Sequence, residues 1–142
     1  MATINPYLNF NGNAAEAFEF YKSVFGGELA GAQQYKDAPG NENMTPQELQ
    51  GMMHIALPIG NGSILMASDI VPSMGHRKAE GNNCYLSIEA DSKEHAAQLF
   101  NGLSAGGVVQ MPLEDTFWNA YFGMFVDKFG ICWMVNYTYP QQ

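Results

Sequence analysis

The sequence predicts an α+β fold made of two βαβββ modules in tandem. Segments in which apolar and polar residues alternate are interrupted by two segments with helical spacing, and each helical segment ends in a Gly-Gly pair, at residues 26–27 and 106–107. The order of elements in the first half recurs in the second half. We therefore expect a single domain of two modules, at about 1–70 and 82–142, joined by a linker at 71–81 that is rich in Pro, Gly and polar residues.

The first module begins with a strand and a helix. Apolar residues alternate with asparagines over Ile4–Phe10, which predicts a strand. Apolar residues then recur at three- and four-residue spacing from Ala14 to Phe25, which predicts an amphipathic helix with Asn13 as its N-cap. The rest of the module is expected to contain strands at 28–35, 52–59 and 63–68, a loop at 36–50 with one turn of helix after Thr45, and a hairpin turn at 60–62.

The second module repeats this order. A strand over Cys84–Ile88 leads into a helix that Asp91 or Ser92 caps, and three further strands are expected at 108–111, 120–126 and 131–137. Chance similarity is the alternative to a true repeat, and the shared order of elements argues against it. The matching segments are Tyr7-Leu8-Asn9-Phe10 with Tyr85-Leu86-Ser87-Ile88, and Gly62-Ser63-Ile64-Leu65-Met66 with Gly130-Ile131-Cys132-Trp133-Met134.

Composition excludes several classes of function. The chain carries 14 acidic against six basic side chains, so it lacks the clustered Lys and Arg that neutralise nucleic-acid phosphates. A charged fraction of 14% with 13% aromatic residues argues against disorder. No apolar run approaches the ~20 residues that cross a bilayer, the N-terminus lacks the pattern of a signal peptide, and the two cysteines form no short motif. We expect no nucleic-acid or membrane partner and a cytoplasmic location.

Three segments resemble one protein family in their order along the chain. They are Tyr7–Asn13 leading to Phe20-Tyr21, the hairpin from His54 to Asp69, and Thr116-Phe117-Trp118 leading to Asp127–Gly130 and Trp133. With the tandem βαβββ plan, they resemble the vicinal oxygen chelate superfamily, which includes glyoxalase I, bleomycin-resistance proteins and extradiol dioxygenases, and within it the PhnB-like branch. That branch usually has Gly and Pro where this chain has Asn119 and Lys128. The resemblance implies a curled mixed sheet around a central cup, and a homodimer.

The resemblance also implies where a metal ion would bind. Superfamily members that use a divalent ion hold it with one residue from the first and last strand of each module, usually His or Glu. The matching positions are Asn5, Met66, Asn83 and Met134, whose amide and thioether groups are poor ligands for catalytic Zn²⁺, Ni²⁺, Mn²⁺ or Fe²⁺. We therefore expect no metal there. The sequence shows no glycine-rich fingerprint for a dinucleotide or for S-adenosylmethionine, so no cofactor is expected.

Strand alternation assigns side chains to the two faces of each sheet, and the face opposite the helices would line the cup. His54 would face either the cup or a dimer seam. Trp118 and Tyr121 would either line a pocket or lie in the core or an interface. The methionines would either form a soft pocket lining or fill the core. The candidate ligand-binding residues are Tyr7, Asn9, His54, Met66, Ser68, Tyr85, Trp118, Tyr121 and Met134.

Few titratable side chains are candidates for chemistry. His54 could act as a base near neutral pH, and Glu114, in the loop expected before the seventh strand, is a second candidate base. Asp69 is expected to cap a turn. The basic cluster His76-Arg77-Lys78 is either an anion-binding patch or a solvated loop, and His95 is expected to be exposed.

Three functions stay open on the sequence alone. The first is binding of a small molecule in a metal-free cup without chemistry, as in bleomycin-resistance proteins. The second is a metal-independent enzyme that acts on a small metabolite with His54 or Glu114 as base. The third is a dimeric structural or regulatory protein without a ligand. A cup of Asn, Tyr, Ser and Met side chains favours the first.

Overall fold

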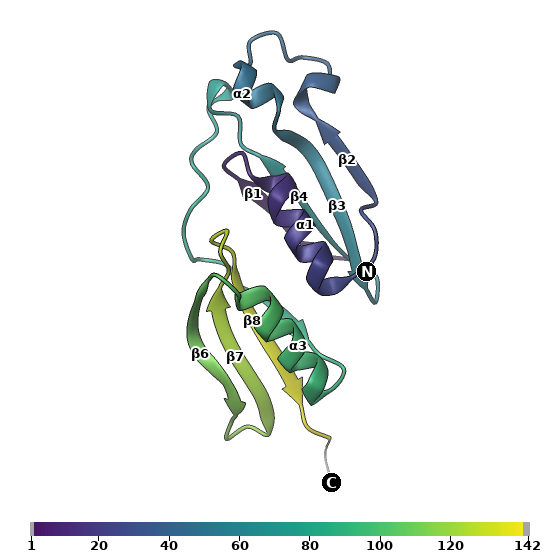
Figure 1. Cartoon of the computed structure of the whole chain (residues 1–142), viewed down its shortest axis with the longest axis vertical. Coiled ribbons are helices and arrows are strands. Elements are labelled where there is room, and N and C mark those ends of the chain that lie inside the picture. Colours follow the sequence, from purple (N-terminus) through teal and green to yellow (C-terminus); the bar gives the residue numbers. More distant parts are fainter. Residues whose placement is uncertain (1, 141–142) are drawn as a thin grey trace. The chain divides into compact units, whose positions relative to one another are not determined.

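The computed structural model describes residues 2–140, which divide into two compact units with a boundary between Ala79 and Glu80. Each unit places a long helix against a four-stranded sheet (Figure 1). The first unit contains β1 (Tyr7–Phe10), α1 (Ala14–Phe25), β2 (Gly31–Gln34), α2 (Pro46–Leu49), β3 (Met52–Gly60) and β4 (Ser63–Asp69). The second contains β5 (Leu86–Glu89), α3 (Lys93–Ser104), β6 (Val108–Asp115), β7 (Ala120–Val126) and β8 (Cys132–Thr138).

The two sheets have the same topology. Their strand orders are β1-β4-β3-β2 and β5-β8-β7-β6, so the first strand of each unit lies beside the last. That pair is parallel in both sheets, and the other neighbours are antiparallel. The predicted α+β fold class and the repeat of strand, helix and three strands are therefore confirmed. No helix among residues 2–140 has the length and apolarity needed to cross a membrane.

The core of the first unit lies between α1 and one face of the sheet. Phe18 occupies its centre, because its ring lies edge-on to Phe10, at 6.3 Å between centroids, and to Tyr21, at 5.6 Å. The helix is amphipathic as expected, and its buried residues face buried side chains of β1, β3 and β4. The buried apolar residues of these elements are Phe10, Ala14, Ala17, Phe18, Tyr21, Ile55, Leu57, Leu65 and Ala67.

The second unit buries α3 against its sheet in the same way. The ring of Phe100 lies edge-on to Phe125, with centroids 5.1 Å apart. Gly123 permits this approach, because a Cβ there would lie 2.5 Å from Cε2 of Phe100. The buried indole of Trp133 donates a 2.9 Å hydrogen bond to the carboxylate of Asp127. The face of each sheet that packs on the helix is thus apolar, and we call the opposite face the helix-free face.

Several strands differ from their predicted bounds, among them β2, which begins at Gly31 and not at residue 28. β1 begins at Tyr7, not at residue 4, and β5 begins at Leu86, not at residue 84. β6 extends to Asp115, so Glu114 lies in a strand and not in the predicted loop. The added part of the strand contains Pro112, which has no backbone N–H to donate to a β-ladder. It is tolerated because β6 is an edge strand with register shifts on either side of Met111.

The N-terminus of α1 is capped from another part of the chain. Asn13 occupies the predicted N-cap position, but its side chain makes no capping hydrogen bond. Oδ1 of Asp69 instead accepts hydrogen bonds from the backbone N–H groups of Gly12, at 3.0 Å, and Ala14, at 2.9 Å. Its Oδ2 accepts from the backbone N–H of Met52, at 2.8 Å. Asp69 is 2% exposed, so one buried carboxylate at the end of β4 joins the starts of α1 and β3.

The segment predicted as a linker is held against the first unit. The side-chain amide of Asn11 exchanges two 2.8 Å hydrogen bonds with the backbone of Ala79. Glu48, which also completes a capping box with Thr45 at the start of α2, accepts hydrogen bonds from the backbone N–H of Ser73, at 3.0 Å, and from its hydroxyl, at 2.6 Å. The chain from residue 71 to residue 79 therefore belongs to the first unit.

Candidate functional site

The helix-free face of the first sheet brings together five of the predicted ligand-binding residues. In the parallel pair β1–β4, Tyr7 lies opposite Met66 and Asn9 lies opposite Ser68. In β3, Ala56 lies opposite Met66, and alternation places His54 on the same face. The group therefore consists of Tyr7, Asn9, His54, Met66 and Ser68, with Ala56 between them.

Tyr7 and His54 form the polar centre of this face. The hydroxyl of Tyr7 lies 3.4 Å from Nδ1 of His54, and the two rings are 5.9 Å apart with an angle of 36° between their planes. Tyr7 is 48% exposed and His54 is half-buried, so both can be reached from solvent. The Tyr7 hydroxyl donates to Nδ1 when the imidazole carries its proton on Nε2, which then remains available to a ligand.

The helix-free face of the second sheet carries a row of methionines. Met111 lies opposite Met124, and Met124 lies opposite Met134, so three thioether side chains are neighbours across β6, β7 and β8. Of these three methionines, only Met134 was predicted for this face. Met111 and Met124 were missed because cross-strand register is not visible in a single sequence. Tyr85, also predicted, donates a 2.8 Å hydrogen bond from its hydroxyl to the side-chain oxygen of Gln110.

The structure separates the two aromatic residues predicted as pocket walls. Trp118 is half-exposed, and its ring lies edge-on to Phe122, which shares the helix-free face with Met124 by alternation. Tyr121 points to the other face, because its ring lies under the ammonium group of Lys93, the first residue of α3, at 4.8 Å. Tyr121 is therefore not brought together with the other candidates.

Glu114 lies on the helix-free face of the second sheet, opposite Phe122. Its side chain is exposed, and among residues 2–140 it makes no hydrogen bond or ion pair. An exposed carboxylate without a partner has nothing to fix its direction. The structure therefore supports His54 better than Glu114 as a candidate base.

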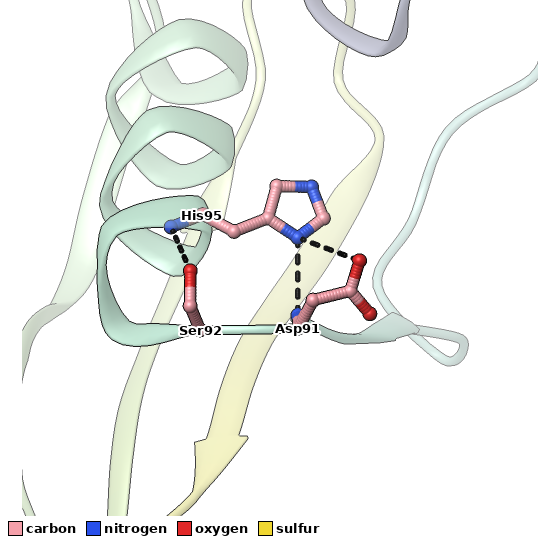
Figure 2. Close-up of polar contacts among 3 residues, drawn as sticks. All are labelled: Asp91, Ser92 and His95. Atoms are coloured by element: carbon pink, nitrogen blue, oxygen red, sulfur yellow. Dashed lines mark hydrogen bonds and ion pairs between the residues drawn. The ribbon is translucent and has the colours of Figure 1, made fainter.

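Asp91, Ser92 and His95 form a helix cap and not a catalytic triad (Figure 2). The hydroxyl of Ser92 accepts a 3.0 Å hydrogen bond from the backbone N–H of His95, which confirms one of the two predicted N-caps. The imidazole does not contact this hydroxyl: its Nδ1 accepts from the backbone N–H of Asp91, at 3.1 Å, and lies 3.7 Å from the Asp91 carboxylate. His95 is half-exposed, less than the sequence predicted.

The four residues at the superfamily's metal positions do not fit a divalent ion. The side-chain oxygen of Asn5 already accepts a 3.1 Å hydrogen bond from the backbone N–H of Ile64, and Asn83 lies exposed in a bend. Met66 and Met134 offer only thioether sulfur, a soft ligand that suits Cu(I) better than a catalytic Zn²⁺ or non-haem Fe²⁺ ion. Within the described part of the chain, no three His, Cys, Asp or Glu side chains cluster as a metal site.

Comparison with known proteins agrees with this architecture. The model of the Glyoxalase/Bleomycin resistance protein/Dioxygenase superfamily matches residues 3–135. The chain belongs to this superfamily. The superfamily resemblance predicted from the three sequence segments is thereby confirmed. Because folds of this kind carry many unrelated activities, membership does not by itself assign a reaction.

Individual relatives of the superfamily cover nearly the whole chain. Protein YjdN from Escherichia coli K12 is 32% identical over a 146-residue alignment that covers 97% of each chain. Protein PA1353 from Pseudomonas aeruginosa has a crystal structure with 42% identity and a TM-score of 0.85, over 97% of this chain and 98% of that one. The PhnB protein from Bacillus cereus shares the fold, with 24% identity and a TM-score of 0.76 over 96% of this chain and 100% of its own.

Proposed function

We propose that the protein binds a small, mostly apolar molecule on the helix-free face of its first sheet, without a metal ion. The observation that carries this proposal is the pair formed by Tyr7 and His54. A phenol and an imidazole lie 3.4 Å apart on an accessible sheet face, and neither side chain is tied to the backbone by a hydrogen bond that the structure records. Two polar anchors of this kind can orient a ligand.

The residues around the pair support an apolar ligand. Met66 and Ala56 lie beside Tyr7 across the sheet and provide a soft apolar surface, while Asn9 and Ser68 add an amide and a hydroxyl at one end. Small-molecule sites are typically apolar surfaces with a few polar groups that fix orientation. The methionine row on the second sheet offers a surface of the same character.

The same pair supports a second candidate function, metal-independent proton transfer. In the tautomer that carries its proton on Nδ1 and donates it to the Tyr7 hydroxyl oxygen, His54 presents an unprotonated Nε2 to a substrate. An imidazole is a suitable general base near neutral pH, and a hydrogen bond to a neighbouring phenol can fix the orientation of the ring. This enzyme and the binding protein differ in one observable, which is whether the ligand leaves chemically changed.

A thermal-shift screen of metabolites tests the binding proposal. A ligand that binds only the native protein raises the melting temperature in a saturable way. We expect Tyr7→Ala and His54→Ala to weaken the affinity of such a ligand by roughly tenfold or more, since each removes an anchor worth about 1.4 kcal/mol or more. Tyr121→Ala is the matched control, because Tyr121 lies on the opposite face of the other sheet.

The screen also separates the alternatives. EDTA is expected to leave the shift unchanged. A shift that persists in Tyr7→Ala, or that EDTA abolishes and added metal restores, contradicts the proposal. Recovery of an altered ligand after incubation assigns the enzyme function to the same pair of residues.

A further inference from the structure

A cleft in the first unit lies apart from the Tyr7–His54 face. It has a volume of about 620 Å³, within the range of roughly 300–1,000 Å³ typical of small-molecule sites. Three segments line it: the turn after β1 at residues 11–12, the region of α2 at residues 45–51, and the chain after β4 at residues 69–78. None of the five residues assigned above to the ligand-binding face lines this cleft.

The cleft lies beyond the carboxyl ends of two parallel strands. β1 and β4 are parallel neighbours, and they end together at Phe10 and Asp69. The cleft begins where both strands stop, with Asn11 and Gly12 on one side and Ile70 on the other. Ligands of open α/β sheets commonly bind beyond the carboxyl ends of parallel strands, because the chain diverges there.

The walls of the cleft are cross-linked and therefore preorganised. Asp69 joins the turn at Gly12 to the start of β3, and Glu48 joins α2 to Ser73. Asn11 holds Ala79 through two hydrogen bonds, which fixes the far end of the lining segment. A site whose walls are already ordered loses little conformational freedom when a ligand binds.

Both carboxylates of the cleft are already engaged. Asp69 is buried, accepts three backbone N–H groups and faces the positive end of the α1 dipole. Glu48 accepts from the hydroxyl and backbone N–H of Ser73 and from the backbone N–H of Thr45, and these hydrogen bonds lower its pKa to about 2. The oxygens of both carboxylates are thus already bound by donors within the protein.

Three side chains that line the cleft still have hydrogen-bond donors available to a ligand. Lys78 and Gln47 make no side-chain hydrogen bond or ion pair within residues 2–140. Nδ1 of His76 accepts a 2.8 Å hydrogen bond from the backbone N–H of Val71, so the neutral ring carries its proton on Nε2 and can donate it. Arg77, between His76 and Lys78 in sequence, is exposed but does not line the cleft.

From this arrangement we propose that the cleft binds a small organic acid with a single carboxylate on an apolar body. The carboxylate pairs with Lys78 and accepts a hydrogen bond from His76, and the apolar body packs against Ile70 and Pro72. One lysine matches one negative charge, whereas phosphate sites typically use several cations or free backbone N–H groups, and the N–H of Gly12 is already bound to Asp69. Of the two alternatives given for the basic cluster at residues 76–78, the proposal favours an anion-binding patch.

Nuclear magnetic resonance titration of the full-length protein with four probes tests this proposal. Benzoate is the carboxylate probe, benzamide its neutral counterpart, benzylamine its charge-reversed counterpart, and inorganic phosphate the competing anion. We expect benzoate to cause saturable shifts of the backbone amides of Gly12, Gly51 and Ser73, and the other three probes to bind at least about tenfold more weakly. Lys78→Gln is expected to weaken benzoate binding by about tenfold, and Lys36→Gln, which makes the same charge change outside the cleft, to leave it unaltered.

Four outcomes overturn the proposal: no saturable shift with benzoate, equal or tighter binding of benzamide, benzylamine or phosphate, shifts centred on Tyr7 and His54, or equal binding by the two lysine variants. Different backbone amides report on the cleft and on the helix-free face. A negative result for the cleft therefore does not contradict the proposed function, and a negative result for the helix-free face does not contradict binding in the cleft.

Discussion

Replacing Asp69 with Ala is expected to lower the free energy of unfolding by about 4 kcal/mol, because it leaves three backbone N–H groups without their acceptor. Each unsatisfied buried donor costs roughly 1–3 kcal/mol, and Asp69 is only 2% exposed, so water replaces the lost oxygens poorly. The loss is a large share of the ~5–15 kcal/mol that stabilises a typical domain. Urea denaturation followed by far-ultraviolet circular dichroism measures it as a lower midpoint.

Asp37→Ala is the matched control for this substitution. Asp37 lies in the same unit, is exposed, and among residues 2–140 makes no side-chain hydrogen bond. Its replacement is expected to change stability by no more than about 0.5 kcal/mol. Equal midpoints for the two variants would show that Asp69 does not join α1 to β3 in the way the hydrogen bonds indicate.

Gly107→Ala is expected to destabilise the protein by about 3 kcal/mol or more. A Cβ at this position would lie 2.1 Å from the backbone oxygen of Val126 and 2.9 Å from two backbone atoms of Asp127. Backbone atoms cannot rotate away as a flexible side chain can, so β7 or the end of α3 has to shift. Tryptophan fluorescence during urea denaturation reports this loss, since Trp118 and Trp133 both lie in the second unit.

Gly31→Ala provides the comparison. A Cβ at Gly31 meets nothing within 4 Å, and its φ is not in the left-handed region, so the same methyl group is expected to change stability by about 0.5 kcal/mol at most. If Gly107→Ala and Gly31→Ala unfold at the same urea concentration, the close contact at Gly107 carries no structural constraint.

Local patterns in the sequence predicted most of the fold. The spacing of apolar residues located α1 at its observed bounds, Ala14–Phe25, because a helix displays its buried face every three to four residues. The hairpin turn was also predictable, since Asn61 and Gly62 adopt positive φ angles of 51° and 80°, which Asn and Gly favour. The side-chain acceptor at the start of α1 was not predictable, because it is Asp69, 55 residues beyond Ala14.

Strand alternation predicted which face of the sheet each candidate residue occupies, but not which residues contact one another across the sheet. Parity along each strand placed Tyr7, Asn9, Met66 and Ser68 on one face, and the register confirms that they share it. Parity does not give the partner across the sheet, so the contact between Tyr7 and His54 and the methionine row were not foreseen. The cleft at residues 11–78 depends on three segments distant in sequence, which no local pattern identifies.

The proposed function rests on a ligand held by Tyr7 and His54, and the most direct measurement is a search for that ligand. The wild-type protein, purified without added ligand, is denatured, and the released small molecules are identified by mass spectrometry. We expect one species in near-stoichiometric amount, absent from the double variant Tyr7→Ala/His54→Ala and retained by Tyr121→Ala. Release of no small molecule by the wild type, or of the same species in the same amount by the double variant, would contradict a binding site on the helix-free face.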